Sequence, residues 1–159
     1  MRPFRCLLST LTLAFLSAGG IKSQNTANGA AANQMVASAT TVTFCDLLEH
    51  SEKFTNRIIR VQARYETDFE KAVIVSPSCP TPIPMMWVKF GDHWESRTTR
   101  SVRKTMSKMR WRVPLDVVFI GEFKSDGRYG HMDMYTLLIE VYKVEAATRL
   151  KDAAASPSS

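Results

Sequence analysis

The chain has 159 residues, which is room for one domain. Hydrophobic residues make up 45% of it and charged residues 23%, a composition that excludes a wholly disordered chain and a polytopic membrane protein. The formal net charge is +6, because 21 lysines and arginines outnumber 15 acidic residues.

The first twenty residues have the order of an export signal. Arg2 and Arg5 precede an apolar run at residues 6–16, and small residues at 17–20 follow it. The run is too short to cross a bilayer, which takes about 20 helical residues. We therefore predict that residues 1–20 are a cleaved signal peptide, that no membrane span remains, and that the protein is periplasmic or secreted. The alternative is a buried N-terminal helix.

Loss of this segment would leave two cysteines, Cys45 and Cys79. An even number of cysteines in an exported protein predicts a disulfide. The alternative is a pair of free, buried thiols. Neither cysteine belongs to a CxxC pair, so a four-cysteine zinc site and a redox motif have no support.

Composition divides the rest of the chain into a domain and two flanks. Residues 21–42 are small and polar, with little apolar surface to bury, and are predicted to form a flexible linker. Residues 146–159 have a similar composition and are predicted to form a disordered tail. The folded domain is expected to span residues 43–145.

Within this domain the pattern predicts a short helix followed mainly by strands. Thr43 is suited to cap the helix, with Asp46 at the spacing of a capping box. Residues 59–66 alternate between apolar and polar, the pattern of a strand with one buried face. Residues 115–123 are apolar on both faces, which predicts a strand covered on both sides. The other predicted elements are strands at 72–76, 85–90 and 135–144, a proline-rich loop at 77–84, a helix at 96–109 and a turn at 125–130.

Five short strands with a helix between the third and the fourth are the element order of an OB-fold. The prediction is therefore a mainly β protein, a five-stranded, partly open OB-like barrel with a short N-terminal helix. A barrel is favoured because five strands bury their apolar faces best by closing on themselves. The competing folds are a β-sandwich that lacks two strands and an α+β sheet with one helix.

The sequence resembles a group of small, exported, largely uncharacterised bacterial proteins with an OB-like barrel. The residues that carry the resemblance are Cys45-Asp46-Leu47-Leu48, Phe54, Arg57, Ile59-Arg60-Val61, Phe69-Glu70, Cys79, Trp87 and Gly130-His131. The resemblance spans nearly all of the predicted domain and implies no particular activity. Asn56 stands where such proteins usually carry glycine, and the basic segment from Arg97 to Arg112 is not expected of the group.

This basic segment is the most unusual feature of the sequence. It holds seven positive charges and no acidic residue, which makes it a candidate site for phosphate backbones, anionic lipids or acidic polymers. The alternative is a solvated helix face without a partner. Because OB-folds bind single strands by combining charge with stacking, Trp87, Trp111 and Tyr129 are a candidate aromatic platform. The candidate anion-binding residues are Arg97, Arg100, Arg103, Lys104, Lys108, Arg110 and Arg112.

No pattern in the sequence points to catalysis. There is no GxSxG elbow and no P-loop, and the three histidines lie on different predicted elements, so no catalytic residue, metal site or cofactor is predicted. Gly130 and His131 are expected to shape a structural turn. The favoured function is a non-enzymatic exported binding or structural module, whose partner is an anionic polymer or a protein. The alternatives are a polyanion- or oligonucleotide-binding protein that uses residues 97–112, and a metal-dependent hydrolase.

Overall fold

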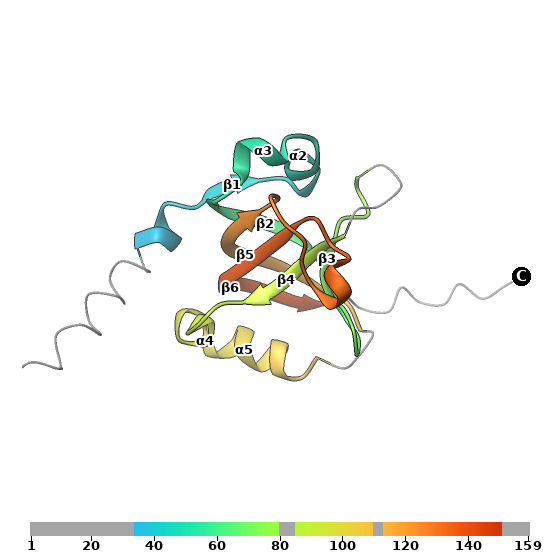
Figure 1. The fold of residues 1–159 in the computed structure, drawn as a ribbon. Coiled ribbons are helices and arrows are strands. Elements are labelled where there is room, and N and C mark those ends of the chain that lie inside the picture. Colours follow the sequence, from blue (N-terminus) through green and yellow to red (C-terminus); the bar gives the residue numbers. More distant parts are fainter. Residues whose placement is uncertain (1–33, 80–84, 110–112, 151–159) are drawn as a thin grey trace, which may run out of the picture.

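The computed structural model describes residues 34–79, 85–109 and 113–150, and its strands form one sheet that closes into a barrel (Figure 1). The sequence predicts 1–20 as a signal peptide, and this segment lies outside the described residues. The elements are β1 (Thr40–Val42), α2 (Phe44–Glu49), α3 (Ser51–Phe54), β2 (Arg57–Thr67), β3 (Ala72–Val75), β4 (Met86–Phe90), α4 (Trp94–Arg97), α5 (Arg100–Ser107), β5 (Leu115–Lys124), the 3-10 helix η1 (His131–Asp133) and β6 (Leu138–Arg149).

The strands are connected as in an OB-fold. Their order is β1-β2-β3-β4-β6-β5, and a further pairing of β2 with β5 closes a five-stranded barrel, with β1 outside it. β4 and β6 run parallel, whereas the other pairs around the barrel are antiparallel. The shortest strand pairing is between β3 and β4, where only Val73 and Ile74 pair with Trp87 and Met86. The predicted OB-like barrel is thus confirmed.

The alternation predicted for β2 is also confirmed. Ile59, Val61, Ala63 and Tyr65 lie in the core and are at most 7% exposed. Because side chains alternate across a strand, the even-numbered residues between them face the outside of the barrel. The charged and polar side chains of β2 are therefore placed on its outer surface.

The inner face of β5 is buried as predicted, whereas its outer face is buried only at Ile120, so the predicted cover on both sides is only partly found. Phe119 is fully buried in the core, and Ile120 on the opposite face is 5% exposed. Ile120 lines the same small hollow as Val36, Ala37 and Ala39. The chain that precedes β1 therefore lies beside the outer face of the barrel.

The predicted flexible linker, 21–42, is wrong at its C-terminal end. Thr40–Val42 forms β1 and pairs in parallel with residues 59–61 of β2. β3 pairs only with residues 64–67 of β2, so the edge beside 59–61 is open and β1 covers it. The part of the predicted linker at 21–33 lies outside the described residues.

The predicted disordered tail, 146–159, is wrong at its start. β6 continues to Arg149, which pairs with Leu115 at the beginning of β5. The register between these strands shifts on either side of Phe119 and Ile120. The strands nevertheless remain paired over the whole length of β5. Residues 151–159 lie outside the described part of the chain.

Local chemistry explains how the barrel begins. The hydroxyl of Thr43 accepts a hydrogen bond from the backbone N–H of Asp46 at 3.0 Å, so the predicted cap of α2 is confirmed. Asn56, in the turn before β2, has a φ of 59°. Asparagine tolerates this left-handed conformation, and its N–H donates to the carbonyl oxygen of Phe123 at 2.7 Å. The turn thus joins the start of β2 to β5.

The predicted helix at 96–109 is wrong in detail, because the structure has two helices, α4 and α5. Thr98 between them has extended backbone and is 5% exposed. Its hydroxyl donates to the carbonyl oxygen of Trp94 at 2.9 Å and accepts from the N–H of Val144 at 3.0 Å. This hydrogen bond to β6 interrupts the predicted helix. Figure 1 shows α2 and α3 at one end of the barrel, and α4 and α5 at the other.

Candidate functional site

Three basic side chains form one face of α5 and its C-terminal cap. Arg100, Lys104 and Lys108 are four residues apart, so they follow one side of the helix, and all three are exposed. Val102 and Met106, on the other side, pack against the core. The ion pairs within the described residues involve other lysines and arginines. These three residues, the basic face of α5, therefore present positive charge to solvent.

Further basic residues surround this face. Arg97 donates to the carbonyl oxygen of Asp92 at 3.1 Å, and Arg103 donates to that of Glu95 at 3.0 Å. Arg149 of β6 donates to the carbonyl oxygen of Lys108. These bonds position the guanidinium groups without neutralising their charge. The predicted residues Arg110 and Arg112 lie outside the described part of the chain.

The candidate aromatic platform is in another part of the barrel. Trp87 packs on Tyr135 with ring centroids 5.1 Å apart, and Tyr129 exchanges backbone hydrogen bonds with Tyr135. Trp87 pairs with Leu138, the first residue of β6, whereas the basic face of α5 lies beside residues 147–149 at its other end. The structure therefore does not bring this platform and the basic face together. Trp111 lies outside the described residues.

The turn predicted at Gly130 and His131 has a clear steric reason. Gly130 has a φ of +76°, and a Cβ atom there would lie 2.5 Å from the Trp87 ring. His131 opens η1, and its carbonyl oxygen accepts from the N–H of Met134 at 3.3 Å. Gly130 thus permits the close packing of the turn on Trp87, and His131 contributes through its backbone.

A second charged cluster lies on the outside of β6. Lys89 and Lys124 both contact Glu140, at 3.0 and 3.4 Å. Partial burial opposes ionisation of Glu140, but these hydrogen bonds and charges outweigh it and lower its pKa.

Burial and the neighbouring carboxylates Glu122 and Glu140 raise the pKa of Tyr142 to about 12, so this hydroxyl stays protonated and donates to Glu122.

Replacing Glu140 with glutamine is expected to lower stability at neutral pH and to have little effect in acid. A carboxyl whose folded pKa is lowered contributes stability above its ordinary value, here 4.5, and that contribution is lost as the pH falls through the folded pKa. Urea denaturation of both proteins from pH 7 to pH 3 measures this. Glu49→Gln, at an exposed glutamate, is the control. A stability difference that persists unchanged at pH 3 would contradict the assignment.

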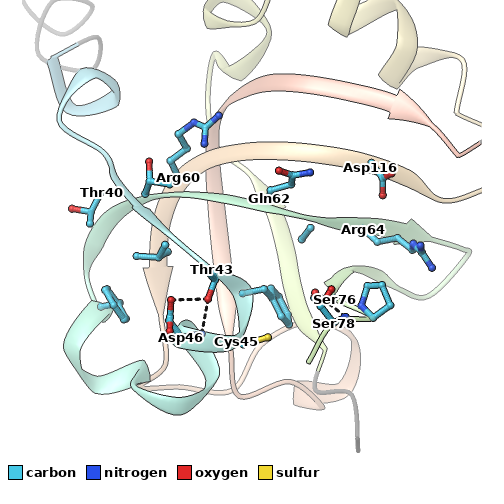
Figure 2. Close-up of a pocket in the computed structure, with 16 residues that line it drawn as sticks. Thr40, Thr43, Cys45, Asp46, Arg60, Gln62, Arg64, Ser76, Ser78 and Asp116 are labelled. Atoms are coloured by element: carbon cyan, nitrogen blue, oxygen red, sulfur yellow. Dashed lines mark hydrogen bonds between the residues drawn. The ribbon is translucent and has the colours of Figure 1, made fainter. Parts of the chain in front are cut away.

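A groove of about 840 Å³ lies beside β2 and is lined by both polar and apolar side chains. Figure 2 shows it bounded by the outward side chains of β2, by residues 40–46 and by residues 76–78. The predicted disulfide is confirmed: Cys45 and Cys79 are bonded, with Cα atoms 5.5 Å apart. No local pattern in the sequence predicts this groove, because its lining comes from β1, α2, β2 and the segment after β3.

The remaining sequence-based expectations concern metals, membranes and relatives. In the described ranges, no group of three histidine, cysteine, aspartate or glutamate side chains is placed to hold a metal ion. The helices found in those ranges are all too short or too polar to cross a bilayer. No known protein-family model matches the chain, and no curated protein matches it.

Proposed function

We propose that the protein is an exported, non-enzymatic binding module that holds polyanionic chains on the basic face of α5. The resemblance to small exported bacterial proteins and the disulfide support export, since disulfides persist in oxidising compartments. The barrel provides a rigid base, because Thr98 ties the start of α5 to β6.

The observation that carries this proposal is the alignment of Arg100, Lys104 and Lys108 without acidic partners among the described residues. Basic side chains at the surface release counterions when they neutralise a polyanion, and this gives affinity that falls with salt. Since Trp87 and Tyr129 lie at the other end of β6, stacking on them adds nothing at this face. Binding is therefore expected to be salt-dependent and independent of base sequence.

The triple variant R100A/K104A/K108A is expected to elute from heparin at lower salt than the wild-type protein. With a fluorescent single-stranded oligonucleotide, the slope of log K against log salt should fall by about 2, since each single-strand contact contributes roughly 0.7. Fluorescence anisotropy over a salt series measures the slope. Two oligonucleotides of different sequence should give the same slope and affinity.

The control variant K53A/R57A/R128A removes the same charge from exposed sites outside α5. If net charge alone caused retention, both triple variants would lose affinity equally, and the proposal would be wrong. Unchanged elution of R100A/K104A/K108A would also reject it. Circular dichroism of each variant verifies that the barrel is intact.

The alternative function is a metal-dependent hydrolase. Among the described residues, no cluster of metal-binding side chains supports it. Metal analysis of the purified protein, with hydrolase assays before and after chelation, tests it directly. Bound metal together with activity lost on chelation would favour the hydrolase over the binding module.

A further inference from the structure

The groove beside β2 has two walls that are covalently joined. Residues 40–46 form one wall and residues 76–78 the other, with Gln62 of β2 between them and Arg64 further along β2, on the side of residues 76–78 (Figure 2). The bond between Cys45 and Cys79 links the two walls. A groove fixed in this way loses less conformational entropy when a ligand binds.

Arg64, which lines this groove, has a buried hydrogen-bond donor without an acceptor. Its Nε atom has no exposed surface and no hydrogen-bond partner among the residues that the structure describes. A buried donor without an acceptor costs free energy, more so when it belongs to a charged group. Because Arg64 as a whole is half-buried and lines the groove, an acceptor brought by a ligand would bond to its terminal nitrogen atoms and not to the buried Nε, and a planar guanidinium prefers a carboxylate.

Asp116 provides the opposite charge next to it. Arg64 and Asp116 are register partners on β2 and β5, and both line the groove. Opposite charges at paired positions usually stabilise one another directly. Here, however, no ion pair joins them, and neither forms an ion pair with another described residue.

The other charged side chains of the groove already have an ion-pair or hydrogen-bond partner. Arg60 pairs with Glu145 at 2.6 Å, and Asp46 accepts a hydrogen bond from the hydroxyl of Thr43. A ligand therefore meets one available positive and one available negative group, Arg64 and Asp116. A doubly charged anion would be repelled by the two aspartates, whereas a molecule with both charges would not.

We propose that this groove binds a small zwitterion, with its carboxylate on Arg64 and its ammonium group on Asp116. Hydroxyl groups of Ser76 and Ser78 lie in the same groove and can bond to the carboxylate. The volume of about 840 Å³ is within the usual range for small-molecule sites. The groove and the basic face of α5 are lined by different residues, although Asp116 pairs with Thr148, which lies beside Lys104 and Lys108.

Thermal unfolding with alanine, 4-aminobutanoate, butanoate and butylammonium tests the proposal. At least one of the two zwitterions should raise the Tm as its concentration increases, and the single-charge compounds should raise it less. Calorimetric titration of the Arg64→Gln and Asp116→Asn variants should show roughly tenfold weaker binding or more, the loss typical of a charge-assisted hydrogen bond.

Arg57→Gln and Asp92→Asn are matched controls, since both residues are exposed and outside the groove. Ser78→Trp changes an exposed residue of the groove wall and should block binding without disturbing the core. The proposal is overturned if neither zwitterion binds, if butanoate binds as well as 4-aminobutanoate, or if Ser78→Trp and Arg64→Gln bind as the wild type does. Heparin retention should be unchanged in Ser78→Trp, which alters no charge.

Discussion

Substitution of Gly121 by alanine is expected to reduce the free energy of unfolding by about 3 kcal/mol or more, the upper end of overpacking costs. A Cβ atom at this position would lie 2.2 Å from the carbonyl oxygen of Glu140 and 2.9 Å from the Cα atom of Val141. Both are backbone atoms of β6, so no side-chain rotation relieves the clash. The strands β5 and β6 would have to separate at the place where their register shifts.

Urea denaturation followed by circular dichroism measures this loss. Gly127→Ala is the control, because the atoms nearest to a Cβ atom there belong to the ring and hydroxyl of Tyr129, a side chain that can move. Its effect is expected to be small, since alanine also restricts the unfolded chain. Equal stability of the two variants would show that β5 and β6 do not approach as closely as the structure shows.

Removal of the disulfide is the second change with a large expected effect. The bonded cysteines are 34 positions apart in the sequence, and on the chain-entropy model a loop of this length contributes about 3–4 kcal/mol. C45A/C79A should therefore unfold at a lower urea concentration than the oxidised protein. The double variant is preferred to a single one, because it leaves no reactive thiol.

Reduction of the wild-type protein offers an internal control for this variant. Its denaturation midpoint in dithiothreitol should approach that of C45A/C79A, and mass spectrometry without reduction should show the two cysteines linked. A C45A/C79A variant as stable as the oxidised wild type would contradict the expected contribution. The groove beside β2 should also lose affinity for its ligand, because its two walls would no longer be joined.

Local patterns in the sequence predicted the strands well. The alternation at 59–66 predicted β2, because burial on one face leaves a period of two in the chain, and the nearly continuous apolar run at 115–123 predicted β5. Asp46 at three residues from Thr43 predicted the start of α2, since a cap depends only on neighbouring residues. The disulfide also followed from composition, because removal of the predicted signal peptide, which carries Cys6, leaves two of the three cysteines.

Elements that depend on distant partners were missed. Thr40–Val42 has no strand pattern of its own and becomes β1 only because part of the β2 edge is left open by β3. Thr98 interrupts a helical pattern because it bonds to Val144, which is far away in the sequence. The same reason explains why the tail up to Arg149 is ordered.

The sequence alone determined the OB-like order of strands, the cysteine pair and the concentration of positive charge in one segment. Only the tertiary structure decided that Trp87 lies away from the basic face of α5, and that Arg64 and Asp116 share a groove without pairing. Periodicity and charge are properties of neighbouring residues and can be read along the chain. The meeting of side chains from β2, β5 and the segments that flank them depends on how the barrel closes, which brings together residues that no local pattern connects.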